Sequence, residues 1–153
     1  MSKMTAKIKK SPNKAIKKLE EIAKQMKGDN LVKVGLPKGS NNYPDGTSVI
    51  MVGNVHEFGS PSRGVPERSF LRSTLNEKSG KYKNDLKKLG KKVLLGEMTS
   101  EQSLQMLGLM ASSDVKDKIT DIKEPALTSR EGNPLVDTGH LRQSITYEVG
   151  NAD

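Results

Sequence analysis

The chain contains no cysteine and no tryptophan, and its aromatic residues are three tyrosines and two phenylalanines. The absence of cysteine excludes disulfide bonds and thiolate metal sites. No apolar run approaches the ~20 residues that a membrane-spanning helix needs. The N-terminus also lacks the uninterrupted apolar stretch of a secretory signal. We therefore expect a cytoplasmically made protein that does not associate with a membrane.

The composition predicts one domain, residues 1–153, with a lean core. Leu, Ile, Val and Phe together make up about 22% of the 153 residues. That fraction is just above the level, about 20%, below which a charged chain tends to stay disordered. We expect modest stability for the isolated subunit, supplemented by burial against neighbouring subunits.

Lysine is concentrated in two runs. Residues 1–27 carry a net charge of +7 and residues 78–92 a net charge of +6, although the whole chain carries only +8. The two basic helices could touch phosphate, an acidic protein surface or only solvent. Neither run contains arginine, and base readout prefers bidentate Arg or Asn. One functional alternative is therefore a nonspecific DNA-binding protein that uses these Lys-rich helices.

Hydrophobic spacing and turn residues predict an α+β fold, in which a small β-sheet packs with several helices, including a long antiparallel pair. In the helix predicted for 47–58, Met51, Val55 and Phe58 share one face. The glycine at position 80 allows a break in the longer helix that follows. Thr99 and Gln102 match a capping box, which predicts the start of the second long helix. The predicted elements are a basic N-terminal helix at 11–27, strands at 31–36 and 145–149, a long helix that starts near 67 or 69 and ends at 95, a second long helix from 99 to 122, a helical turn at 138–143, and flexible segments at 38–46 and 125–136.

Two groups of residues invite an enzymatic interpretation. The tripeptide Asp137-Thr138-Gly139 matches that of aspartic proteases, in which two such aspartates share a proton. Only fourteen residues follow Gly139, too few to complete that fold, so we expect Asp137 or Thr138 to cap a turn and Gly139 to ease its backbone. The residues His56, Glu57 and His140 could contribute to a metal site, but zinc sites need three or four ligands at a known spacing. We predict no catalytic residues, no cofactor and no metal.

The remaining distinctive residues fit packing and assembly. We expect four large apolar side chains to lie in the core: Phe58, Phe70, Leu71 and Leu141. Charged residues around the Gly/Pro-rich turn that follows Gly59 suit the rim of an interface, because arginine pairs with carboxylates across a subunit boundary better than lysine does. The interface candidates are Arg63, Glu67, Arg68, Arg72 and Arg142.

Two segments about eighty residues apart carry a family resemblance. The first runs from 55 to 61 as VHEFGSP and continues at 66–71 as PERSFL, and the second is PLVDTGHLRQSI at 134–145. Together they resemble the tail-completion, or head–tail joining, proteins of long-tailed bacteriophages, which read roughly "IHEFG…IPARPFLRPAL" and "PLVDTGxLRxSI". The sequence departs from that pattern at Glu67, where a small residue is usual, and at Ser73-Thr74, where Pro-Ala is frequent.

The resemblance covers roughly residues 47–76 and 133–149, and it implies a structural rather than enzymatic role. Family members are small α+β virion proteins that form a ring where the tail meets the head–tail connector. The resemblance implies a homo-oligomer, expected to be hexameric, made in the host bacterial cytoplasm. Its expected partners are the tail tube or tail terminator protein and the head–tail connector or stopper protein, with nonspecific contact to genome DNA in the lumen.

Overall fold

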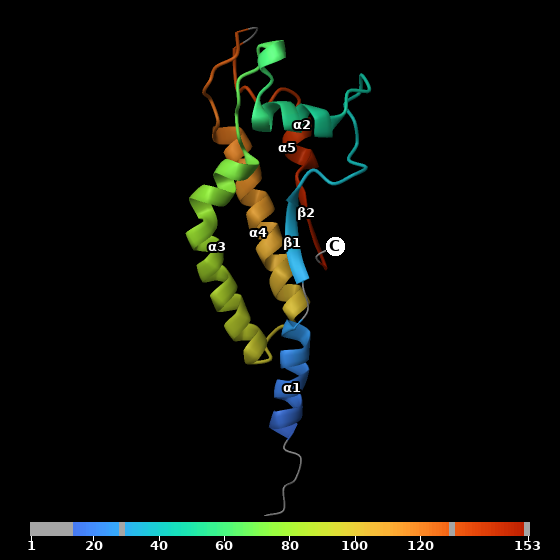
Figure 1. Ribbon diagram of the computed structural model, residues 1–153, viewed down its shortest axis with the longest axis vertical. Helices are drawn as coiled ribbons and strands as arrows, with labels where there is room; N and C mark the ends of the chain where they lie inside the picture. The colour runs from blue at the N-terminus through green and yellow to red at the C-terminus, as the bar shows by residue number, and fades with distance from the viewer. Residues whose placement is uncertain (1–13, 28–29, 129–130, 152–153) are drawn as a thin grey trace, which may run out of the picture.

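The computed structural model describes residues 14–27, 30–128 and 131–151 (Figure 1). Its helices and two-stranded sheet confirm the predicted α+β class. The elements within the described residues are α1 (Lys14–Met26), β1 (Asn30–Gly35), α2 (Val49–Phe58), a 3-10 turn η1 (Pro61–Arg63), α3 (Leu71–Leu94), α4 (Ser100–Asp121), α5 (His140–Ser144) and β2 (Thr146–Asn151).

The sheet pairs β1 with β2 in antiparallel register, although about 110 residues separate the two strands along the chain. Val32 lies opposite Val149 and Val34 opposite Tyr147, so these four side chains share one face. Strand β2 packs on α4 at a glycine, because a Cβ added at Gly108 would lie 2.3 Å from Cδ2 of Tyr147. The sheet therefore rests on α4 through a contact that only glycine permits.

Helices α3 and α4 form the predicted antiparallel pair and lie side by side in Figure 1. The predicted capping box starts α4: the Thr99 hydroxyl accepts from the Gln102 N–H (3.1 Å), and the Gln102 side chain accepts from the Thr99 N–H (2.9 Å). Ion pairs cross between the helices from Lys78 and Lys81 to Asp114, at 2.8 and 2.9 Å. The break allowed at position 80 does not occur, since α3 is continuous from Leu71 to Leu94.

The apolar stripe of α3 is only partly buried. Leu89 and Val93 are buried, whereas Leu75 and Leu86 are 60% and 46% exposed. The physical reason is the small size of the sheet: its two strands lie against α4, which leaves α3 with α4 as its main neighbour. Helical spacing identified the face correctly but could not reveal how little of it would be covered.

The core lies at the end of the molecule where α2 and α5 meet the start of α3 and the end of α4 (Figure 1). Phe70 and Leu141 are buried there, as predicted, and Leu71 is partly buried against them. The prediction for Phe58 is wrong, because this ring is 60% exposed. The buried positions of α2 are Val49, Gly53 and Glu57, and Phe58 lies about 100° round the helix from Glu57.

The basic N-terminal helix and the two segments predicted to be flexible are found in the structure at or near their predicted positions. The basic helix forms as α1, while residues 11–13 lie outside the described residues. The segments 38–46 and 125–136 contain neither helix nor strand in their described parts. Two backbone hydrogen bonds nevertheless hold the segment 38–46. The Ser40 N–H donates to the Pro37 carbonyl (3.1 Å), and the Tyr43 N–H donates to the Thr47 carbonyl (2.9 Å). Their flexibility stays a prediction.

Candidate functional site

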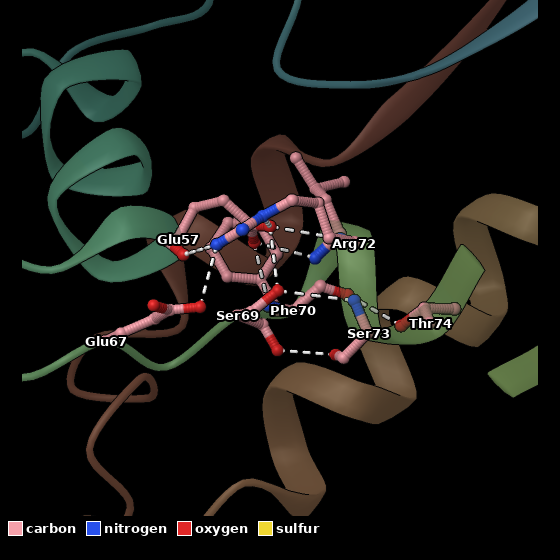
Figure 2. Close-up of polar contacts among 8 residues, drawn as sticks. Glu57, Glu67, Ser69, Phe70, Arg72, Ser73 and Thr74 are labelled. Carbon is pink, nitrogen blue, oxygen red and sulfur yellow. Dashed lines mark hydrogen bonds and ion pairs between the residues drawn. The ribbon is translucent and has the colours of Figure 1, made fainter. Parts of the chain in front are cut away.

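The first resembling segment contains a buried carboxylate that holds the start of α3. Glu57 lies in the last turn of α2 and is only 3% exposed. Its Oε2 accepts from the Phe70 and Leu71 N–H groups, both at 2.8 Å, and its Oε1 accepts from the Arg72 N–H at 3.0 Å (Figure 2). The first N–H groups of a helix have no partner within it. Glu57 therefore caps α3 from another helix, where the local N-cap residue, Phe70, has no side-chain acceptor.

Two side chains complete this arrangement, which we call the Glu57 junction (Glu57, Ser69, Phe70, Leu71 and Arg72). The Ser69 hydroxyl donates to Glu57 Oε1 at 2.8 Å, and Arg72 Nε donates to the same oxygen at 3.0 Å. Arg72 Nη2 also donates to the Glu57 carbonyl at 2.7 Å. The junction therefore fastens α2 to α3 through both the side chain and the backbone of one residue.

The junction keeps Glu57 ionised. Burial raises the pKa of Glu57, but the hydrogen bonds donated by Leu71, Arg72, Ser69 and Phe70 together lower it below its ordinary value. The positive end of the α3 dipole favours the same charged state. Glu57 is thus a structural anion at neutral pH, with its acceptor capacity taken by its neighbours.

The lowered pKa of Glu57 predicts a loss of stability in acid. Because the folded-state pKa lies below the unfolded value, near 4.5, the stabilisation is complete above that value and is lost as the pH falls through the folded-state pKa. We expect the difference in unfolding free energy between wild type and Glu57→Gln to narrow below about pH 4.5. Urea unfolding at several pH values measures this, and a difference that stays constant into acid would contradict the assignment.

Arg68 is a second buried charge in the same segment and is not an exposed interface residue, which corrects the prediction. It is 4% exposed. Its Nε donates to the Pro125 carbonyl at 2.7 Å and its Nη2 to the Ala126 carbonyl at 3.2 Å. Its guanidinium therefore holds the start of the segment 125–136 against the body. Sequence reasoning could not anticipate this, because the partners are backbone atoms more than fifty residues away.

Replacing Arg68 by Met, which keeps much of the apolar stem, should remove both carbonyl contacts. We expect the unfolding free energy to fall by about 2 kcal/mol, since hydrogen bonds from a charged group are worth about 1.5–3 kcal/mol. Trypsin should also cut faster after Lys123, which is exposed just before the anchored carbonyls. The matched control, Arg63→Met, changes an exposed side chain and should cost less than about 0.5 kcal/mol. Equal losses in the two variants would refute this role of Arg68.

The second resembling segment forms the turn into α5. Gly139 occupies the N-cap with a φ of 77°, as its predicted role requires. The Thr138 hydroxyl accepts from the His140 N–H at 3.3 Å, which fits the predicted turn-stabilising role. His140 Nε2 lies 2.8 Å from the Asn41 carbonyl, and its ring lies 4.6 Å from that of Tyr43. The segment is therefore fixed to the loop that follows β1.

The two resembling segments meet in space. A Cβ added at Gly53 of α2 would lie 3.6 Å from Leu141 and 3.8 Å from Phe70, so both segments converge at this glycine. A cavity of about 340 Å³ is lined by His56 of the first segment and by His140 of the second. Residues 72–133, which separate the two segments along the chain, therefore bring the second segment back beside the first.

The cavity does not assemble a metal site from the described residues, among which no group of three or more His, Asp or Glu side chains is placed to hold an ion. Burial, followed by the charge of Arg68, lowers the pKa of His56. Its Nδ1 is buried, with no hydrogen-bond partner in the described part of the chain. His56 is therefore neutral at pH 7 and packs as a cavity wall.

The exposed side of the junction is an aromatic and charged surface that we call the Phe58 face (Phe58, Arg63, Glu67 and Arg72). The Arg72 guanidinium lies 4.6 Å from the centre of the Phe58 ring and 2.8 Å from Glu67 Oε1. Phe58, Arg63 and Glu67 also line an open groove beside η1. Arg142 lies apart from this face, half-buried, with its Nε 3.3 Å from the Lys116 carbonyl. Three of the five interface candidates are therefore together and exposed.

Glu57 is the residue whose role sequence reasoning missed, since it was considered only as a possible metal ligand or acid–base group. One signal was available: an acidic residue in the last turn of an apolar helix is unfavourable for the helix dipole unless it has a partner elsewhere. The partner is the start of α3, whose N-cap residue, Phe70, makes no capping hydrogen bond from its side chain.

The sequence matches no protein-family profile, no curated protein and no solved structure. Among the described residues, no helix combines the length and the apolar character needed to cross a membrane.

Proposed function

We propose that this chain is a structural virion protein that forms a ring at the head-proximal end of a phage tail, completing the tail and joining it to the head connector. The observation that carries the proposal is the convergence of the two resembling segments. Leu141 and Phe70 approach each other at Gly53, and residues of both segments line one cavity. A family pattern that is the signature of a fold should produce such packing between its parts.

The state of the charged groups supports a structural role over an enzymatic one. Glu57 accepts three backbone N–H groups, Arg68 donates to two carbonyls, and His140 contacts a third. A general acid or base must be within reach of a substrate proton, and these groups are already committed within the chain. We therefore assign no catalytic residue.

The Phe58 face is the surface that we assign to assembly. Arginine and aromatic residues dominate the energetics of protein interfaces, and here an exposed Phe ring carries an Arg guanidinium beside an open groove. Ring closure requires each subunit to dock one face onto a different face of its neighbour. We expect the Phe58 face to be one of these two faces, in a ring of six copies.

Electron microscopy of lysates tests the proposal. In a phage carrying a nonsense mutation in this gene, we expect DNA-filled heads beside separate, unjoined tails. A plasmid copy of the gene should restore intact virions, which controls for effects on neighbouring genes. Normal virions without the protein would remove the neck assignment.

A further inference from the structure

We propose that α1 and the second half of α3 form one binding surface for the phosphate backbone of double-stranded DNA. We call it the basic end; on α3 it comprises Lys83, Lys87, Lys88, Lys91 and Lys92, and on α1 it comprises Lys14, Lys17, Lys18 and Lys24. All nine lysines are exposed. The inference does not depend on the proposed ring.

The first observation is a division among the lysines of the 78–92 run. Lys78 and Lys81 both form ion pairs with the single carboxylate of Asp114 on α4. The five that follow are joined to no carboxylate among the described residues by a hydrogen bond or ion pair. Their charge is therefore available to a partner, whereas that of the first two is already used to fasten α3 to α4.

The second observation is the direction in which these five lysines face. Lys83, Lys87 and Lys91 follow at intervals of four residues, as do Lys88 and Lys92, so they cover one side of the helix. Leu89 and Val93 are buried on the opposite side. Positions four residues apart rise about 6 Å along a helix axis, so the charges form a continuous row.

The third observation is that the fold brings the two basic runs together, although fifty residues separate them in sequence. Helix α1 contacts α3 and lies beyond the turn between α3 and α4 (Figure 1). At that turn, a Cβ added at Gly96 would lie 2.7 Å from Lys18 Nζ. The lysines of α1 therefore extend the surface formed by the lysines of α3 at the same end of the molecule.

The chemistry of this end favours backbone contact with a duplex. Lysine is a point charge that suits phosphate, whereas base readout uses bidentate Arg or Asn and single-strand binding uses stacked aromatic rings. Neither arginine nor an aromatic ring occurs at positions 14–27 or 83–96. We therefore expect binding that is independent of sequence and governed by the release of counterions from the DNA.

The test is fluorescence anisotropy of the purified chain with a short labelled duplex at several salt concentrations. Replacing Lys87, Lys88 and Lys91 by Gln should reduce the slope of log affinity against log salt by about 2 to 3, because each neutralised phosphate contributes about 0.9. The matched control replaces Lys38, Lys116 and Lys123 by Gln, which removes the same charge elsewhere. That variant should change the slope by less than about 1.

Three results would overturn the inference. Wild-type chain that fails to bind duplex at low salt would remove the site. An equal reduction of the salt slope in both triple variants would show that DNA binding depends only on the net charge of the chain and not on the basic end. Salt-sensitive self-association abolished only by the first triple variant, without DNA binding, would assign the basic end to an acidic protein surface. Circular dichroism should show both variants folded, since all but the half-exposed Lys116 are exposed positions.

Discussion

Replacing Glu57 by Gln is expected to lower the free energy of unfolding by about 3 kcal/mol or more, a loss typical of removing one partner of a buried charged network. The amide keeps one acceptor oxygen but turns its NH2 donors toward N–H groups that need an acceptor. The Phe70, Leu71 and Arg72 N–H groups, which now share two carboxylate oxygens at 2.8–3.0 Å, cannot all be satisfied. Urea unfolding followed by circular dichroism measures the loss.

The matched control for Glu57→Gln is Glu67→Gln. Glu67 also pairs with Arg72, at 2.8 Å, but its side chain is 55% exposed. Exposed ion pairs contribute about 1 kcal/mol or less, so the control should stay close to wild type. Similar small losses in the two variants would mean that α3 does not depend on the Glu57 carboxylate.

Replacing Gly108 by Ala is expected to destabilise the fold by about 1 to 3 kcal/mol, the usual cost of overpacking a close contact. The new methyl group would lie 2.3 Å from Cδ2 and 2.7 Å from Cγ of Tyr147. Cγ is next to the backbone end of the ring, so rotation of the tip cannot relieve the clash and β2 must move away from α4. This loss should exceed the gain of about 1 kcal/mol that alanine brings to a helix interior.

The controls for Gly108→Ala are Gly80→Ala and Gly90→Ala in α3. A Cβ added at either position meets no other atom within 4 Å, so both variants should be up to about 1 kcal/mol more stable than wild type. Adding Tyr147→Val to Gly108→Ala should recover part of its loss. Thermal or urea unfolding distinguishes the outcomes, and stabilisation by all three alanines would refute the close contact.

Elements specified by local signals could be predicted from the sequence. The Thr99 and Gln102 pattern identified the start of α4, because a capping box satisfies backbone groups within three residues. Hydrophobic spacing identified both β2 and α3. Gly139 was identified because a turn of that shape favours a residue without a Cβ. Each of these depends on interactions within a few residues along the chain.

The candidate site could not be predicted in the same way, because its contacts join distant residues. Glu57 and Arg68 look like surface charges in the sequence, and they are buried because α3 and the segment at 125–126 supply their partners. Phe58 was assigned to the core by its spacing, yet the presence of Glu57 on the buried side turns it outward. The local sequence pattern predicted that the Phe58 ring is buried, whereas the tertiary contacts bury the Glu57 carboxylate instead.

The measurement that tests the central claim most directly is complementation of the nonsense mutant with two matched variants, followed by electron microscopy. Phe58→Ser alters the Phe58 face, and Leu109→Ser alters an equally exposed apolar residue on α4, since both side chains are 60% exposed. Both proteins should fold. We predict unjoined heads and tails with Phe58→Ser and intact virions with Leu109→Ser. Intact virions with both variants would contradict assembly through the Phe58 face.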